Sequence, residues 1–390
     1  MKDYTKGEKT SLNFHRVLNS IWLNEGVSRV ELSRELNLDK ATVSVIVSSL
    51  MNNNLVLEAE KQNTSSRPGR QPVGLEINRC FGAVAGIELH IDRINCVISD
   101  MHHNILDSIS LEGRVDRKNI DYKLLSLIDH IKKLKSLNGM PLLGAAVAIP
   151  GLVDSENGII LKAPAIGLWD ESYDFSKRVA ARADIPVLLI NDANACASGI
   201  LSSHRRNRYD SFLFVYLGFD PVQDKLEGEV DHPGIGLGIV LNGKLHMGPK
   251  GSAGEFQTIG YRSNRVNQFN LTLDEIHNYR HSEEIQIKVA DDIASHLGFL
   301  VNVLNIEQIF LGGDLAYYHP SLEGRLKRAI DESWPYDKPV PCAVNFLYDE
   351  HFLPAKGAAG MLLDRLFSIP DVLDENNLAI LKDAIKTAAG

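Results

Sequence analysis

Two short amphipathic segments lie near the start of the chain. Ser28 and Glu31 have the spacing of a capping box, which predicts a helix from residue 29 through residue 36. Three apolar side chains of this helix are expected to face inward: Val30, Leu32 and Leu36. After a turn at residues 37–38, Asp39 is a natural N-cap for a second helix over residues 40–52. Its apolar side chains fall on one face at about 100° per residue and are expected in a core: Val43, Ile46, Val47 and Leu50.

The opposite face of this second helix carries small and hydroxylated residues. The face consists of Ala41, Ser44, Val45 and Ser48, flanked by Lys40 and Thr42. Side chains of this size let a helix lie close to base edges in the major groove of DNA. The helix is therefore a candidate recognition helix, and the expected DNA contacts on it are Lys40, Thr42, Ser44 and Ser48.

Two short apolar stretches at residues 55–57 and 73–77 follow and have the pattern of strands. The polar segment between them holds Lys61, Arg67 and Arg70, with no acidic residue between these three. A basic wing of this kind suits phosphates or a narrow minor groove. The pattern predicts a winged helix-turn-helix domain over residues 1–78 that binds double-stranded DNA, with Arg67 and Arg70 as further contacts. The alternative is a small helical domain whose serines and threonines are merely solvated.

From residue 79 the hydrophobic pattern changes to alternating strands and helices. Strands are expected at residues 81–87, 94–99, 142–149, 187–190, 212–217, 236–241 and 308–311, and helices at residues 122–137, 175–183 and 283–304. This order predicts an α/β fold of two lobes. We expect one lobe over residues 79–192, a second over residues 193–353, and C-terminal helices over residues 354–390 that return to the first lobe.

Charge and cysteine content limit the classes of protein that remain. The chain of 390 residues has a net charge of −9, which divides into +1 for residues 1–78 and −10 for the rest. DNA should repel the acidic part, so DNA contact is expected only in the N-terminal domain. The four cysteines are scattered without a close pair, and no apolar run resembles a signal peptide or a membrane span. A soluble protein of the reducing cytoplasm is expected.

Four motifs carry a resemblance to a known family. They are AIPGLVDSENGIIL from Ala148, NDANACASG from Asn191, GIGLGIVLNGKLHMGPKGSAGEF from Gly234 and FLGGDLA from Phe310. The chain resembles the ROK family of sugar kinases and sugar-responsive repressors over nearly its whole length, and is most similar to the repressor branch. The resemblance implies a winged helix followed by a two-lobed, actin-like (ribonuclease H-like) sugar-kinase fold.

The two turns that contact phosphates in the family's kinases are altered here. The first corresponds to residues 86–92, where Glu88, Leu89 and His90 occupy what would be an open, glycine-lined anion cradle. Before the second, residues 219–232 are inserted, with five carboxylates against one lysine. Carboxylates repel a triphosphate, although this insertion taken alone is equally compatible with a neutral surface loop. Together the changes predict no ATP-dependent phosphoryl transfer, no catalytic residues and no cofactor.

The sugar-binding positions are better kept. Asn191 and Asp192 match the family's NDAN positions and Glu255 matches its conserved glutamate, so these three residues are expected to bind an effector sugar. A carboxylate binds two hydroxyls as readily as it deprotonates one. The alternative for Asn191 and Asp192 is a helix cap or an Asx turn.

Three departures from the family pattern lie near these positions. Gln257 and Thr258 stand where the family has glycine and a zinc-binding histidine, and the cysteine cluster that should follow is missing, so no metal is expected. Ala165 replaces a sugar-contacting asparagine. Trp169 is expected to fill the core rather than to stack on a sugar.

Together these observations predict a sugar-responsive regulator that binds a palindromic operator as a homodimer or higher oligomer. One alternative is a sugar kinase with an accessory DNA-binding head. A third possibility is a DNA-binding protein whose degenerate cleft is controlled by a protein partner.

Overall fold

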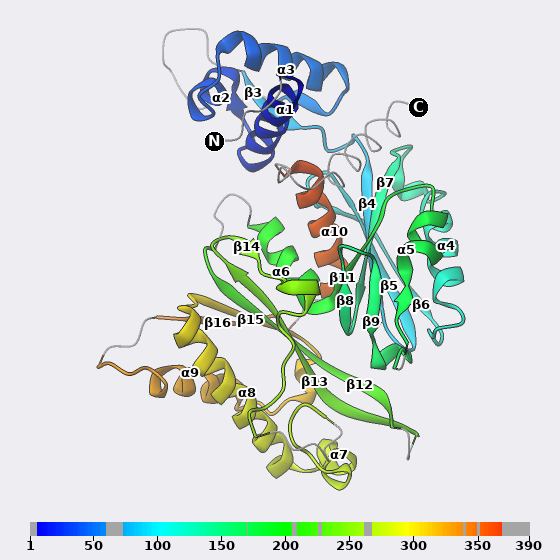
Figure 1. Ribbon diagram of the computed structural model, residues 1–390, viewed down its shortest axis with the longest axis vertical. Helices are drawn as coiled ribbons and strands as arrows, with labels where there is room; N and C mark the ends of the chain where they lie inside the picture. The colour runs from blue at the N-terminus through cyan, green and yellow to red at the C-terminus, as the bar shows by residue number, and fades with distance from the viewer. Residues whose placement is uncertain are drawn as a thin grey trace.

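The protein has an N-terminal domain above two larger lobes (Figure 1). The computed structural model describes residues 6–59, 73–169, 171–204, 209–224, 228–260, 267–337, 341–348 and 352–368, of which residues 6–11 and 220–231 are described by their backbone alone. The N-terminal domain, called the head below, comprises the described residues up to 78.

The head contains three helices and a small antiparallel sheet. Its elements are α1 (Lys6–Leu23), β1 (Val27–Ser28), α2 (Arg29–Glu35), α3 (Lys40–Asn52), β2 (Val56–Glu58) and β3 (Gly74–Ile77). The strand order is β1-β3-β2, with both pairings antiparallel. Helices α2 and α3 with the β2–β3 hairpin form the predicted winged helix-turn-helix.

The predicted helix caps are present. The Ser28 hydroxyl accepts a hydrogen bond from the Glu31 backbone amide, and the Glu31 carboxylate accepts one from the Ser28 amide. Asp39 accepts a hydrogen bond from the Thr42 amide at 2.8 Å. These bonds satisfy backbone donors that have no partner inside the helix.

The expectation for Val30 was wrong, because its side chain is 40% exposed whereas Leu32 is fully buried. Residues two apart on a helix point about 160° away from each other, so Val30 and Leu32 cannot share a face. Helix α1 was not predicted, although its buried Val17, Leu18, Ile21 and Trp22 have helical spacing.

The first lobe is built on a five-stranded sheet with the order β11-β7-β4-β5-β6. Its strands are β4 (Ala83–Leu89), β5 (Arg93–Asp100), β6 (Ile105–Glu112), β7 (Leu142–Ile149) and β11 (Val187–Asn191). Strands β4, β7 and β11 are parallel, whereas β5 and β6 pair antiparallel. The other elements are α4 (Ile120–Ile131), η1 (Lys135–Leu137), β8 (Leu152–Asp154), β9 (Ile159–Lys162), η2 (Pro164–Ile166), β10 (Tyr173–Asp174), α5 (Phe175–Arg178) and η3 (Ala180–Arg182).

The second lobe repeats this arrangement, with the sheet order β14-β13-β12-β15-β16. Its strands are β12 (Phe212–Asp224), β13 (Gly228–Leu241), β14 (Lys244–Leu245), β15 (Gln308–Gly313) and β16 (Ala343–Phe346). Strand β12 is antiparallel to β13 and parallel to β15, so both sheets share one topology. The helical elements are α6 (Asp192–Ser203), η4 (Pro249–Gly251), α7 (Leu273–Asn278), η5 (Tyr279–His281), α8 (Glu283–Leu304), η6 (Leu315–Tyr317), α9 (Leu322–Glu332) and α10 (Leu353–Phe367). The predicted two-lobed α/β fold is confirmed.

Several predicted elements differ in extent. The helix expected over residues 122–137 ends at Ile131, and the one expected over residues 175–183 is divided into α5 and η3. Residues 219–232 do not form an inserted loop, because β12 and β13 continue to pair until Asp224 lies opposite Gly228. Strand β6 was not predicted, since it lies at the sheet edge and its face is largely exposed.

Helix α10 runs back from the second lobe and packs between α6 and the first sheet (Figure 1). The contact depends on residues without side chains. A Cβ added at Gly357 would lie 2.0 Å from the carbonyl oxygen of Ala195 on α6, and one at Gly86 on β4 would lie 1.8 Å from that of Ala355. Ser202 on α6 also donates a hydrogen bond to the Gly360 carbonyl at 2.9 Å. Helices α6 and α10 therefore form a closely packed pair.

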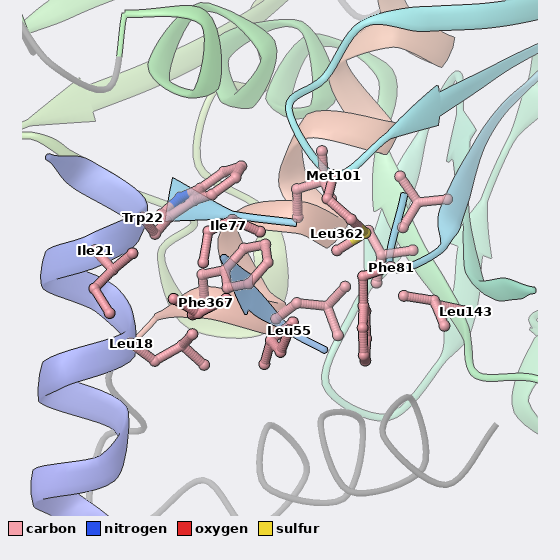
Figure 2. Close-up of a cluster of buried hydrophobic side chains, with 14 of the residues drawn as sticks. Leu18, Ile21, Trp22, Leu55, Ile77, Phe81, Met101, Leu143, Leu362 and Phe367 are labelled. Atoms are coloured by element: carbon pink, nitrogen blue, oxygen red, sulfur yellow. The ribbon is translucent and has the colours of Figure 1, made fainter. Parts of the chain in front are cut away.

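The head and the first lobe share one hydrophobic core (Figure 2). The ring of Trp22 on α1 stacks on that of Phe367 at the end of α10, with centroids 4.3 Å apart and planes 21° apart. The Asn19 amide donates a hydrogen bond to the Phe367 carbonyl at 3.1 Å. Leu55 and Ile77 of the head lie in the same cluster. The head is thus joined to the body by packing as well as by the chain.

The four cysteines are free, as their spacing predicted. In the part of the chain that the structure describes, no helix combines the length and apolar character needed to cross a bilayer.

Candidate functional site

Helix α3 presents the predicted DNA-binding face to solvent. Lys40, Ser44 and Ser48 are exposed, and Val45 between them is 71% exposed. The opposite face, formed by Val43, Ile46, Val47 and Leu50, is buried. The rotation of the helix therefore agrees with the prediction.

Thr42 takes a different position from its neighbours. It is half-buried, and its hydroxyl donates a hydrogen bond to the Asp39 carboxylate at 2.6 Å. Its side chain is thus part of the helix cap, which leaves it less free for a base. Arg67 and Arg70 lie outside the described residues.

A cleft between the two lobes gathers the three residues expected to bind the sugar. It encloses about 160 Å³. It is lined by Pro150, Gly151, Asn191, Asp192, Tyr216, Gly218, Gly234, Ile235, Gly236, Leu237, Ala253, Gly254, Glu255 and Gln268. Strand β11, helix α6, strand β13 and the segment after η4 all contribute, so residues far apart in the sequence meet here.

Asn191 is the N-cap of α6. Its side-chain oxygen accepts a hydrogen bond from the Asn194 amide at 3.1 Å, and its amide group donates one to the Gly151 carbonyl at 3.0 Å. The helix cap that was considered as the alternative role of Asn191 is therefore present. The same side chain also holds the turn at Gly151 against the cleft.

Asp192 follows in the first turn of α6, where the helix dipole favours a negative charge. Its side chain is 9% exposed, and one carboxylate oxygen accepts a hydrogen bond from the Ala193 amide at 2.7 Å. The carboxylate thus has a fixed orientation at the wall of the cleft.

Glu255 lies beside β13, where it forms an isolated antiparallel bridge with Gly236. The preceding Gly254 has φ +95°, and a Cβ there would lie 1.8 Å from the Leu237 carbonyl oxygen, so the chain can approach β13 this closely only at glycine. Glu255 is exposed as a whole residue, but the protein atoms around its carboxyl group displace part of its hydration and raise its pKa. A partly desolvated carboxylate is a strong acceptor for hydroxyl donors.

The region that corresponds to the first phosphate turn is filled by side chains. Glu88 is 6% exposed and accepts hydrogen bonds from Asn95 at 2.9 Å and from the Tyr216 hydroxyl of the second lobe at 3.4 Å. His90 and Asp92 are hydrogen-bonded to each other at 2.7 Å. A second cavity of about 390 Å³ lies next to Glu88 and Tyr216, between the lobes.

The zinc-binding residues of the family have no counterpart among the described residues of this chain. Within the described residues, no group of three or more histidine, cysteine or acidic side chains is placed to hold a metal. Residues 261–266, outside that part, contain none of these residue types. Amide side chains hold the segment instead: Gln268 bonds to the backbone of Ile235 and Phe256.

Three residues of the cleft were missed by the sequence reasoning, and one expectation was wrong. Tyr216, Gly218 and Gln268 line the cleft, but none of them belongs to a motif that marks it. Trp169, expected in the core, is half-buried instead.

The structure is thus a two-lobed α/β domain with a cleft between its lobes. The sequence model of the ROK family matches residues 84–262 of this chain.

Among sequence relatives, the xylose repressor of Staphylococcus xylosus is 31% identical over 246 residues, which is 62% of this chain and 59% of that protein. The alignment thus spans less than two thirds of that relative. The xylose repressor of Bacillus subtilis is 24% identical over 351 residues, 82% of this chain and 86% of that protein.

Among solved structures, a ROK family transcriptional regulator described as a homolog of the E. coli MLC protein has a TM-score of 0.70 at 17% identity. The match covers 97% of this chain and 99% of that one, head included. The likeness shows that the whole fold, from winged helix to second lobe, is shared.

Proposed function

We propose that the protein is a sugar-responsive transcriptional repressor. The head binds operator DNA through Lys40, Ser44 and Ser48 of α3, with Arg67 and Arg70 on the wing, and Thr42 supports α3 through its cap. The cleft binds a sugar through Asn191, Asp192 and Glu255 without phosphorylating it. The relatives named xylose repressors support this proposal, and D-xylose is the first effector to test.

The observation that carries the proposal is the packed connection between cleft and head. Asn191 and Asp192 begin α6, α6 packs against α10, and α10 ends at Phe367, which stacks on Trp22 of the head. A sugar that draws the lobes together shifts α6, and close glycine contacts make α10 follow. Coupling between the cleft and the head requires that the α6–α10 pair has two arrangements and that the sugar binds one of them more tightly than the other.

A repressor of this kind binds a palindromic operator as a homodimer or higher oligomer in the cytoplasm. Two winged helices must then reach successive major grooves, about 34 Å apart along the duplex. A change in the position of α10 against α1 alters the spacing of the two heads, which lowers operator affinity.

The second candidate function is a sugar kinase with a DNA-binding head, and the cavity beside Glu88 is the observation that favours it. Against it stand the side chains at the phosphate turn. Glu88 and the His90–Asp92 pair put carboxylates where a kinase needs open backbone amides for the phosphates.

The experiment uses the full-length protein. DNA duplexes that it retains are selected from a random pool, and their affinity is measured with D-xylose, D-glucose and N-acetylglucosamine. We expect one sugar to weaken operator binding and to raise the Tm. The same protein with ATP, magnesium and that sugar should give no sugar phosphate above background. Phosphorylation that disappears in Asp192→Asn would establish the kinase instead.

The wing is tested separately with Arg67→Ala combined with Arg70→Ala. Each lost phosphate contact lowers the slope of log affinity against log salt by about 0.9. Unchanged affinity and slope would remove both arginines from the DNA interface.

A further inference from the structure

One amide side chain ties together two segments that line the cleft. The side-chain oxygen of Gln268 accepts a hydrogen bond from the Ile235 amide at 2.8 Å. Its amide group donates one hydrogen bond to the Ile235 carbonyl and another to the Phe256 carbonyl, both at 2.9 Å. Ile235 belongs to β13, and Phe256 directly follows Glu255. Gln268 therefore sets the separation between β13 and the carboxylate that faces the cleft.

Gln268 is itself held in place by its neighbours. Asn267, 7% exposed, accepts hydrogen bonds from the amides of Phe269 and Leu271 and donates one to the Leu271 carbonyl. The Thr258 amide donates a hydrogen bond to the Gln268 carbonyl at 3.0 Å. Backbone and side chain of Gln268 are thus fixed before any ligand arrives.

The donor and acceptor inventory separates a positioning role from a contact role. A glutamine amide group has two hydrogens and its oxygen has two lone pairs. Both hydrogens and one lone pair of Gln268 are used on the backbone, so no donor is left for a ligand. Gln268 can therefore contact a ligand only as an acceptor, through the second lone pair of its oxygen, and its three hydrogen bonds act on the cleft through Ile235 and Phe256.

We propose that Gln268 is the positioning residue of the sugar cleft. It fixes the distance between the Glu255 carboxylate and the backbone of residues 234–237, and so selects which polyol fits between them. This inference rests on the proposed sugar-binding function. It predicts that the clamp is needed for sugar binding and not for DNA binding.

The test compares Gln268→Ala with Gln257→Ala, an exposed glutamine of the same segment. Sugar binding is measured as the Tm shift with D-xylose, D-glucose and N-acetylglucosamine. Backbone hydrogen exchange is measured for peptides that contain residues 235–241 and 255–260. We expect Gln268→Ala to weaken sugar affinity about tenfold or more and to speed exchange at the Ile235 amide, because three partly buried hydrogen bonds are lost. Operator affinity without sugar should match wild type, and Gln257→Ala should change nothing.

A third variant, Gln268→Glu, gives a signature that a loss of folding would not. The ionised carboxylate has no hydrogen to donate, so one of its oxygens faces the carbonyl oxygens of Ile235 and Phe256. The protonated acid has one O–H group that can donate to one of them. Its sugar affinity relative to wild type should therefore recover as the pH falls, and that of Gln268→Ala should not.

The outcomes distinguish this inference from the proposed function. If wild type binds a sugar and Gln268→Ala binds it equally, or if exchange at Ile235 is unchanged, Gln268 is no positioning residue and the repressor function stands. If wild type binds none of the three sugars, the proposed function fails, and the role of Gln268 fails with it.

Discussion

The stacked pair of Trp22 and Phe367 gives the sharpest prediction about coupling between cleft and head. Both rings are about 1% exposed, and their centroids lie 4.3 Å apart. Phe367→Leu keeps the position apolar and removes the ring. A stacked aromatic pair contributes about 0.5–1.5 kcal/mol beyond its buried area, and the smaller leucine leaves part of the ring's volume empty, which costs about 0.5–1.5 kcal/mol more. We expect a total loss of about 1–3 kcal/mol in the free energy of unfolding.

The effect on regulation follows from the stacking energy alone. The helix pair α6 and α10 is proposed to have one arrangement with sugar and another without it. If Trp22 and Phe367 stack fully in only one of them, the coupling free energy from this contact is at most the stacking energy. A loss of about 1.4 kcal/mol then reduces the sugar-induced change in operator affinity by about tenfold. Operator affinity is measured by fluorescence anisotropy, with and without the sugar that wild type binds.

The control is Phe175→Leu, at the start of α5. Phe175 is also about 1% exposed, but it lies in a hydrophobic cluster of the first lobe that contains no residue of the head. It should lower the Tm by a similar amount and leave the sugar response intact. A full sugar response in Phe367→Leu, at a Tm as low as that of the control, would refute coupling through this contact.

Four further results are expected. Ser44→Ala should change base preference at the half-site with little effect on the Tm, whereas Val47→Ala should cost about 0.5–2 kcal/mol of stability; the reverse pattern in binding selection and melting would mean that α3 is rotated. Asp192→Asn should leave operator binding intact and weaken sugar binding by about 1–3 kcal/mol in calorimetry, because a donor replaces an acceptor. Because burial raises the pKa of Glu255 above its ordinary 4.5, sugar affinity should fall as the pH drops through that raised value, and Glu255→Gln should flatten the profile. EDTA should leave the sugar-induced Tm shift unchanged. A Tm shift that disappears in EDTA would reveal a bound metal.

Local patterns in the sequence predicted those elements whose signals are complete within a few residues. The capping box at Ser28 and the buried face of α3 are examples, because a helix places neighbours three and four residues apart on one side. Strand β7 was predicted with its observed ends, since a run of apolar residues between Pro141 and Pro150 leaves little choice. The expectation for Val30 failed because it departed from the helical periodicity: Val30 and Leu32 are two residues apart and point to nearly opposite sides of the helix.

The motifs at Asn191 and Glu255 predicted which residues share the cleft, but not what holds them there. The bonds of Gln268 join Phe256 to Ile235 across a long stretch of chain, and no local pattern records such a pairing. The same is true of the extended β12–β13 hairpin. Its residues were taken for an inserted loop because they separate the strand from the turn that directly follows it in the family's kinases, whereas backbone pairing extends both strands through this segment.

The sequence by itself determined the classes of element, the winged helix, the two α/β lobes and the residues that face the cleft, because each depends on periodicity, on turns or on motifs. The return of a C-terminal helix to the first lobe was expected, but only the tertiary structure decided that α10 packs on α6 and that Phe367 meets Trp22. The physical reason is that a hydrophobic side chain specifies burial but not its partner. Which apolar surfaces meet is decided by the fit of the whole chain, and here that fit joins the cleft to the head.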